Sequence, residues 1–493
     1  MEPKSLPQPE FEMASFSKRI AIGAIWTTAD TWGRQAANFA VFTLLAWLLG
    51  PSAYGIMGLA LVVPTILSAP VTRGLPEAIV QRVEIDPLHL DSAFWLLAGA
   101  GLVLAASTMA LARPIALVFG EPELAALIGA TSLMILFNAI GAIPGAVLKR
   151  ELNFRLFAIR SLISTSVGGA IGIGMALNGL GVWSLVGLYL TKSSTEAAIL
   201  LLGGKWRPRL RYSFARCREL FGFARPIVVQ SFVTLVNDET PKVVLGLFLG
   251  PSAVGIYTLA RRLLELLTEI LYAPLFGLAL PAIARVQDQP AKIQRFFDMT
   301  LRLTILVGAP AFIGLATIAP DAVPFVFGPD WVAAVPVVQV MIIIGLQRAI
   351  DGICAATILA LGHSLLLLQL NLAFAIIAPI LIALGTPFGT VGAAVGLVVS
   401  NLALLPILLM AAHRLARIDM SGLLATYPRA LVAGAVMALS VIAWRGFAAD
   451  WSAEPLLIAS SVAIGFISYA GAILLVGRRD LFKTFATLTL LRA

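Results

Sequence analysis

The chain has 493 residues, of which 59% are hydrophobic and only 12% are charged, and its formal net charge is +9. Because a soluble chain carries about 25% charged residues, this composition excludes a soluble globular protein and indicates a polytopic membrane protein. The two cysteines, Cys217 and Cys354, form no disulfide framework and no metal-ligand spacing, so we expect no metal and no cofactor.

The chain begins with a polar, proline-containing segment, residues 1–15, that has no basic region followed by a short apolar core. It therefore differs from a cleaved signal peptide, and we expect a disordered cytoplasmic tail.

Long apolar runs follow, each near the roughly 20 residues that a helix needs to cross the bilayer. They predict an all-α membrane protein with about fourteen spans. The expected limits are 20–49, 53–80, 92–112, 124–147, 156–177, 180–203, 220–249, 253–280, 299–319, 332–361, 363–385, 390–412, 428–446 and 455–476. We expect an N-terminal six-helix lobe at 16–203, a basic cytoplasmic linker at 204–219, a C-terminal six-helix lobe at 220–412 and two extra helices in 413–493.

A duplicated heptapeptide supports the two lobes. Gly50-Pro51-Ser52-Ala53-Tyr54-Gly55-Ile56 returns as Gly250-Pro251-Ser252-Ala253-Val254-Gly255-Ile256, each copy between apolar runs. Val118-Phe119-Gly120 has a partner in Val326-Phe327-Gly328 in the same order. Internal repeats of this kind are typical of transporters whose two halves move against each other around a shared site.

Cations indicate the orientation of the spans. They cluster before the first span and after spans four, six, eight, twelve and fourteen, whereas the alternate connections hold almost none. The positive-inside rule therefore predicts that both termini are cytoplasmic. Since the cations are dispersed along membrane edges, we expect no nucleic-acid partner.

Several ionisable residues lie inside spans, where each needs a partner or a water-filled cavity. Their helical spacing forms polar stripes on the equivalent hairpins of the two repeats. At 1.5 Å per residue, Asp238 lies about 18 Å from Gly250 and Arg261 about 15 Å from it, near the bilayer centre. The predicted cavity residues are Asp30, Arg34, Asn38, Arg225, Asp238, Glu239, Lys242, Arg261, Arg262, Glu265 and Glu269.

The alternative interpretation is that these groups only pair with one another and hold helices together. The candidate pairs are Asp30 with Arg34 and Arg261 with Glu265. For Lys192 with Glu196, and for Arg348 with Asp351, structural pairing is the favoured interpretation.

Motifs along most of the chain resemble the Wzx-type polysaccharide exporters, colanic-acid type, of the multidrug/oligosaccharidyl-lipid/polysaccharide flippase superfamily. The resemblance is carried by Gly23-Ala24-Ile25-Trp26, Leu48-Leu49-Gly50-Pro51 with Tyr54-Gly55, Gln81-Arg82-Val83-Glu84-Ile85, Lys149-Arg150-Glu151-Leu152-Asn153-Phe154, Leu280-Pro281-Ala282-Ile283-Ala284-Arg285-Val286-Gln287 and Pro324-Phe325-Val326-Phe327-Gly328-Pro329-Asp330-Trp331. It implies two pseudo-symmetric six-helix lobes around a central cavity in a bacterial inner membrane. It also implies flipping of an undecaprenyl-pyrophosphate-linked oligosaccharide to the periplasmic leaflet, coupled to H⁺ or Na⁺, alongside a polysaccharide polymerase or other assembly machinery.

We therefore expect a flippase and not an enzyme. Arg34, Arg225, Arg261 and Arg262 would attract the anionic head, because guanidinium groups match phosphate geometry. Desolvated carboxylates of Asp238, Glu239, Glu265 and Glu269 would carry the coupling ion. The rival functions are a cation-coupled drug exporter, a lipid II flippase, and a membrane polymerase or ligase, which would need a larger external loop than any present here.

Overall fold

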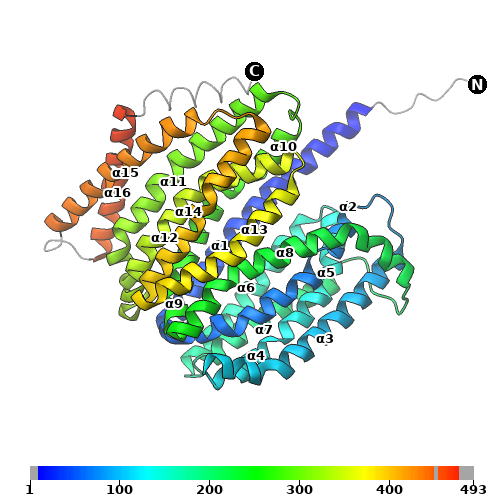
Figure 1. Cartoon of the computed structure of the whole chain (residues 1–493). Coiled ribbons are helices and arrows are strands. Elements are labelled where there is room, and N and C mark those ends of the chain that lie inside the picture. The colour runs from blue at the N-terminus through cyan, green and yellow to red at the C-terminus, as the bar shows by residue number, and fades with distance from the viewer. Residues whose placement is uncertain (1–8, 449–453, 477–493) are drawn as a thin grey trace, which may run out of the picture. The chain divides into compact units, whose positions relative to one another are not determined.

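The computed structural model describes residues 9–448 and 454–476, with only the backbone at 9–32, 34, 154, 424 and 476. Every regular element in these ranges is helical (Figure 1). The elements are α1 (Pro9–Thr72), α2 (Leu75–Gln81), α3 (Pro87–Phe119), α4 (Glu123–Thr131), α5 (Leu133–Arg150), α6 (Phe154–Leu177), α7 (Trp183–Gly203), α8 (Phe214–Leu249), α9 (Pro251–Leu271), α10 (Ala273–Ala284), α11 (Pro290–Phe327), η1 (Pro329–Ala334), α12 (Val335–Ala360), α13 (Ser364–Gly385), η2 (Thr386–Phe388), α14 (Gly389–Ala416), α15 (Ser421–Ala448) and α16 (Glu454–Val476).

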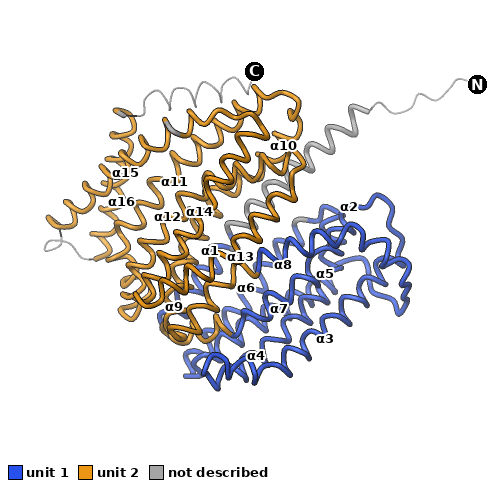
Figure 2. Tube along the Cα trace, in the orientation of Figure 1, with its two compact units in different colours: residues 1–48, 60–235 blue, residues 49–59, 236–493 orange. Residues whose placement is uncertain are grey.

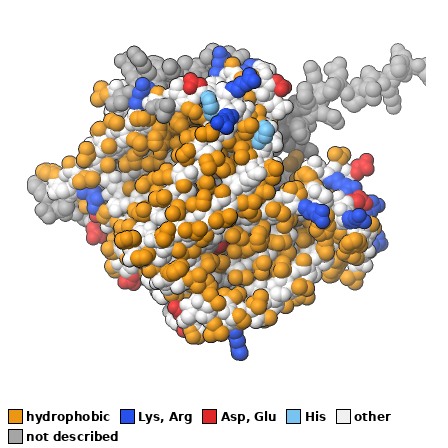
Figure 3. All heavy atoms as spheres, in the orientation of Figure 1, with side chains coloured by type: hydrophobic (Ala, Val, Ile, Leu, Met, Phe, Trp, Pro, Cys, Tyr) orange, Lys and Arg blue, Asp and Glu red, His pale blue; other side chains and the backbone are white. Residues whose placement is uncertain are grey.

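The predicted all-α membrane fold is confirmed. The described residues contain 11 helical stretches long and apolar enough to cross a membrane, or up to 12 if the pair α9 and α10, bent by 51°, is one span. Two stretches, Gln35–Gln81 with 47 residues and Ser364–Ala416 with 53, are longer than one crossing requires. The count of fourteen therefore stays a prediction. Hydrophobic side chains are spread across the visible face and charged side chains lie mainly near its edges (Figure 3), as expected for a surface that faces lipid.

The chain divides into two compact units (Figure 2). Unit 1 comprises Met1–Leu48 and Ala60–Leu235, and unit 2 comprises Leu49–Leu59 and Val236–Ala493. This division differs from the lobe limits expected from sequence. The helix α8 runs without a break through the unit boundary, and the hairpin tip 49–59 packs with unit 2. The helix α1 begins at Pro9, within the segment 1–15 that we expected to be disordered, and residues 1–8 of that segment lie outside the described residues.

Unit 1 is organised around α5, which packs against α2, α3 and α7, while α6 lies along α7. Its core combines small and branched side chains from α2, α3, α5 and the start of α8, including Ile79, Phe94, Ile135, Ile143 and Leu220. Small residues at the contacts let helix backbones approach closely, which is the main source of packing between helices in lipid.

Unit 2 is organised around α12, which packs against α9, α10, α11 and α14. The last two helices, α15 and α16, pack on each other and on α11. An ion pair fixes this contact, since the Nε of Arg445 on α15 lies 2.5 Å from Asp321 Oδ2 on α11. Arg445 Nη1 also donates a hydrogen bond of 2.8 Å to the carbonyl of Thr317.

The repeated heptapeptide adopts the same backbone conformation in both copies. Gly50 has φ 70° and ψ 178°, and Gly250 has φ 80° and ψ −179°, and a proline follows each as the next helix starts. Both tips belong to unit 2 and touch each other reciprocally: a Cβ on Gly55 would lie 1.6 Å from the Pro251 carbonyl oxygen, and one on Gly255 would lie 1.9 Å from the Pro51 oxygen. The sequence duplication therefore corresponds to a structural one.

Candidate functional site

The predicted cavity residues divide between the two units. Asp30, Arg34, Asn38 and Arg225 belong to unit 1, and the other seven to unit 2. The side chains of Asp30 and Arg34 lie outside the described residues, so their predicted pairing stays a prediction. Arg225 is exposed on α8.

In unit 2, α8 and α9 bring Arg261 between two carboxylates. Its Nη2 lies 3.1 Å from Asp238 Oδ1, and its Nε donates to Glu265 Oε1 at 2.6 Å. Arg261 also donates to the backbone carbonyl of Asp238. The pair of Arg261 with Glu265, which the alternative interpretation named, is thus present, and Asp238 joins it. Only 17% of the Arg261 side chain is exposed, whereas 39% of the Asp238 side chain and 29% of the Glu265 side chain are, so the guanidinium is better shielded than the carboxylates that hold it.

We define the unit 2 strip as Asp238, Glu239 and Lys242 on α8 together with Arg261, Arg262, Glu265 and Glu269 on α9. Lys242 Nζ donates to Glu239 Oε2 at 2.7 Å, and both side chains are largely buried. Glu269, two turns from Arg262 on α9, has a buried Oε2 atom with no hydrogen-bond partner among the described residues. The strip therefore contains carboxylates in two states, namely those held by a cation and one that keeps an unused oxygen.

In unit 1, the predicted residue Asn38 faces α6 and α7. Its Oδ1 accepts a hydrogen bond of 3.1 Å from Lys192 Nζ and one of 3.4 Å from Thr165 Oγ1. Glu196, which we expected to pair with Lys192, accepts from Ser164 Oγ at 3.1 Å and lies 4.0 Å from Arg160 Nη1.

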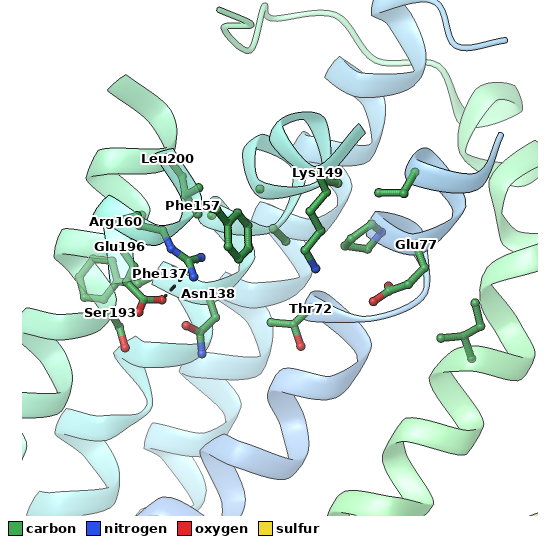
Figure 4. Close-up of a pocket in the computed structure, with 18 of the residues that line it drawn as sticks. Thr72, Glu77, Phe137, Asn138, Lys149, Phe157, Arg160, Ser193, Glu196 and Leu200 are labelled. Carbon is green, nitrogen blue, oxygen red and sulfur yellow. Dashed lines mark ion pairs between the residues drawn. The ribbon is translucent and has the colours of Figure 1, made fainter. Parts of the chain in front are cut away.

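A cavity of ≈520 Å³ lies beside these residues, wholly within unit 1 (Figure 4). It is lined by residues from the end of α1 and from α2, α5, α6, α7 and α8. A volume of several hundred Å³ is in the range of small-molecule sites, about 300–1,000 Å³. The residues that give it chemical character are Thr72, Glu77, Phe137, Asn138, Lys149, Phe157, Arg160, Ser193 and Glu196.

Local sequence explains why space is left here. The lining face of α5 carries Gly141, Ala142, Gly145 and Ala146, whose small side chains let Leu200 of α7 pack against the α5 backbone and project little into the cavity. The short helix α2 starts after a sharp turn at Gly74, with φ 89°, and Glu77 Oε2 accepts the Gly74 N–H at 2.7 Å. The turn at Gly74 places α2 at an edge of the cavity, so the chain does not pass through it.

Two cations meet on one aromatic ring inside the cavity. The Arg160 guanidinium lies 4.0 Å from the centre of the Phe157 ring, and Lys149 Nζ lies 5.5 Å from it. Among the described residues no carboxylate forms an ion pair with Lys149, whereas Glu77 is engaged by Gly74 and Arg73, and Glu196 by Ser164 and Arg160. The cavity thus offers cationic donors for a phosphate, together with amide and hydroxyl groups and aromatic rings that suit a sugar.

Sequence reasoning missed this site. From sequence we expected no cavity role for Lys149, which appears only within a family motif, and we expected Glu196 to pair with Lys192. The available signal was the position of Lys149 in the motif Lys149-Arg150-Glu151-Leu152-Asn153-Phe154, at the end of an apolar run. Arg150 of this motif reaches the last carbonyls of α2, including Ile79 at 3.0 Å, and so holds one wall of the cavity in place.

Comparisons with known proteins agree with this architecture. A family model described as "Polysaccharide biosynthesis protein" matches residues 44–336. The chain is 27% identical to the succinoglycan biosynthesis transport protein ExoT of Rhizobium meliloti (strain 1021) over 66% of each chain, just under two thirds of that relative's length. It is 26% identical to the lipopolysaccharide biosynthesis protein WzxC of Escherichia coli (strain K12) over 70% of this chain and 71% of the relative.

Two solved structures share the fold. A lipid II flippase, MurJ, in an inward closed conformation has a TM-score of 0.74 and 16% identity, covering 94% of this chain and 100% of that chain. A multidrug resistance transporter of the MATE family, in an inward-facing conformation, has a TM-score of 0.61 and 13% identity, covering 78% of this chain and 95% of that chain. At these identities the similarity shows the fold and not the cargo.

Proposed function

The chain belongs to the polysaccharide biosynthesis protein family, and from this premise we propose that it is a flippase for lipid-linked polysaccharide repeat units. The observation that carries the proposal is the unit 1 cavity, which presents Lys149 and Arg160 beside Asn138 and Ser193. The proposed cargo is an oligosaccharide joined through a diphosphate to a polyprenyl chain. The phosphates of its head need cations such as Lys149 and Arg160, and its sugar hydroxyls need uncharged polar groups such as Asn138 and Ser193.

The physical task is to carry that head through hydrocarbon while the polyprenyl tail stays in lipid. An unpaired charge in the bilayer costs several kcal/mol, so the diphosphate must stay bound to cations. In this proposal Lys149 and Arg160 bind the phosphates, since ammonium and guanidinium groups both form charge-assisted hydrogen bonds to phosphate oxygens. Asn138 and Ser193 donate to sugar hydroxyls, and Phe137 and Phe157 provide apolar contact for a sugar face.

We propose that the unit 2 strip couples transport to an ion gradient. Asp238 and Glu265 share Arg261, and Glu239 is held by Lys242, so an incoming cation or proton would have to compete with these pairs. Glu269 has a free oxygen and is the first choice for the ion-binding carboxylate. Arg34, Arg225 and Arg262 remain proposed contacts of the anionic head.

The proposed setting is a bacterial inner membrane with both termini in the cytoplasm, where the sugar is assembled on its lipid carrier. The cations that follow α5 and α7 support this orientation through the positive-inside rule. On this orientation the unit 1 cavity lies toward the cytoplasmic ends of its helices, because Lys149 is in the last turn of α5. The cargo is therefore loaded from the cytoplasmic leaflet and passed to the polymerase on the other side, and the protein itself catalyses no covalent step.

Lipid II transport is the second candidate, because the MurJ structure shares the fold over almost the whole chain. Both cargoes have a polyprenyl diphosphate, and the cavity cations would serve either. The two differ in the sugar and in the peptide of lipid II, so a direct comparison of cargo separates them.

The experiment measures the leaflet distribution of lipid-linked oligosaccharide in cells that lack this protein. Rescue by the wild-type chain is compared with rescue by Lys149→Gln and Arg160→Gln. Arg155→Gln is the matched control, because Arg155 is an exposed cation on the same helix as Arg160 and does not line the cavity.

We expect the deletion to accumulate the intermediate on the cytoplasmic leaflet, and the wild type and Arg155→Gln to relieve it. Lys149→Gln and Arg160→Gln should each lower the transport rate about ten-fold or more, since a hydrogen bond to a charged group contributes about 1.5–3 kcal/mol. Accumulation of lipid II in place of the polysaccharide intermediate would favour the second candidate. Normal surface polysaccharide in the deletion would refute the proposed function, and full rescue by both cavity variants would refute the site.

A further inference from the structure

A second cationic feature of unit 1 lies outside the cavity, in the connection between α7 and α8. Residues 205–218 contain six cations and no carboxylate, alternating in part with apolar side chains. We define the basic strip as residues 205–214, together with Arg218 on the first turns of α8. The proposed transport cycle assigns no role to it.

Hydrogen bonds to the start of α3 hold the backbone of the strip. Trp95 Nε1 donates to the carbonyl of Arg209 at 2.8 Å, and the Arg209 N–H donates to Asp91 Oδ1 at 3.1 Å. The N–H of Ser213 donates to Ser92 Oγ at 2.9 Å. These hydrogen bonds hold the backbone of the basic strip against the start of α3.

This anchoring turns apolar side chains outward. Leu210 is 88% exposed and Phe214 68% exposed, and Tyr212 between them is about half exposed. In contrast, the ring of Trp206 packs edge-on against the ring of Phe94, with 5.9 Å between the ring centroids.

In the part of the chain that the structure describes, four cations of the basic strip have no carboxylate partner that would neutralise their charge. Among the described residues no carboxylate forms an ion pair with Lys205, Arg209, Arg211 or Arg218. The nearby carboxylates are already neutralised: Glu219 binds Arg82 at 2.6 Å, and Asp86 binds Arg216 at 3.0 Å. Excess positive charge with exposed apolar side chains is the pattern of segments that lie in the bilayer interface.

We propose that the basic strip is a binding site for anionic phospholipid headgroups. Leu210 and Phe214 enter the acyl boundary, and the flanking guanidinium and ammonium groups bind the phosphates of neighbouring lipids. A lipid is favoured over a protein partner because the strip joins the ends of two membrane-crossing helices, so its nearest surface is the bilayer. The site would link the function of unit 1 to the charge of one leaflet.

The test labels the full-length purified protein at Leu210→Cys with an environment-sensitive fluorophore. The native cysteines, Cys217 and Cys354, are both buried, so the label is directed to the exposed position. Phosphatidylglycerol, phosphatidylcholine and inorganic phosphate are titrated separately into the protein in detergent micelles. The variant Arg209→Gln/Arg211→Gln is compared with Arg113→Gln, an exposed cation toward the other end of α3.

We expect a blue shift with phosphatidylglycerol at a low half-maximal concentration and none with the other two titrants. Each Lys or Arg near an anionic surface strengthens binding about five-fold, so the double variant should raise the half-maximal concentration about 25-fold, while Arg113→Gln leaves it unchanged. The substitutions leave the anchoring of the strip intact, because its hydrogen bonds to α3 use the backbone carbonyl and N–H of Arg209 and not its side chain. An equal response to phosphatidylcholine, saturation by inorganic phosphate, or an unchanged midpoint in the double variant would overturn the proposal.

Discussion

Replacing Gly255 by alanine should separate the two hairpin tips and destabilise unit 2. An added Cβ would lie 1.9 Å from the Pro51 carbonyl oxygen, whereas real Cβ contacts essentially never fall below 3.0 Å. The two tips must therefore move apart by about 1.1 Å, the difference between these distances. A backbone carbonyl has no alternative rotamer, so the strain is relieved only by shifting a whole helix end.

The magnitude follows from two opposing effects. Overpacking of a dense interior costs about 1–3 kcal/mol, and the backbone contact here places the cost at about 3 kcal/mol. Alanine in place of glycine within a helix contributes about 0.5–1 kcal/mol in the other direction. We therefore expect a net loss of about 2 kcal/mol. Gly55→Ala should behave alike, and the double variant should cost less than the two single costs together, because one displacement relieves both contacts.

Thermal unfolding with a thiol-reactive dye measures this effect without further engineering, because both cysteines are buried until the chain unfolds. Gly99→Ala is the matched control, since an added Cβ on this α3 residue meets nothing within 4 Å. The unfolding midpoint should fall clearly for Gly255→Ala and stay level or rise for Gly99→Ala. Equal midpoints for the two variants would refute the reciprocal packing of the repeats.

Three further changes test other parts of the structure. Arg261→Ala leaves the partly exposed carboxylates of Asp238 and Glu265 without their cation, so it should destabilise the protein by about 1–3 kcal/mol in the dye assay, and adding Asp238→Asn should restore part of the loss. Arg445→Gln should loosen α15 from α11 and increase proteolysis of the last two helices, whereas Asp321→Glu, which keeps the charge, should protect them better than Asp321→Ala. Phe157→Leu removes a ring that faces two cations, and it should weaken cargo affinity about three- to ten-fold in a transport assay without lowering the unfolding midpoint; an unchanged affinity would contradict the cavity assignment.

The helices themselves could be predicted from sequence because bilayer thickness fixes the length of each apolar run. The expected spans 156–177, 363–385 and 455–476 differ by only a residue or two at each end from α6, α13 and α16. For helices that continue beyond the apolar run, the lengths expected from sequence were too short. The helix α11, for example, starts at Pro290 rather than near residue 299, since its polar first turns form a helix outside the hydrocarbon.

The turn at each repeat was also encoded locally. Gly50 and Gly250 need a positive φ that other residues rarely adopt, and the proline that follows each starts the next helix. The ion pair of Arg261 with Glu265 was predictable for the same reason, because residues four apart on one helix always lie on the same face.

Contacts between distant segments decided the rest. The helical spacing of Lys192 and Glu196 predicted a pair, yet Lys192 binds Asn38, a residue 154 positions away. The cavity is built from the end of α1 and from α2, α5, α6, α7 and α8, so no single stretch of sequence carries its pattern. The helices, their turns and the duplication follow from the order of the residues, because these features depend on neighbours along the chain and on the thickness of the bilayer. Which charges are neutralised and which, like Lys149, line the cavity without an ion pair among the described residues depends on how distant helices pack together, and no local pattern contains that information.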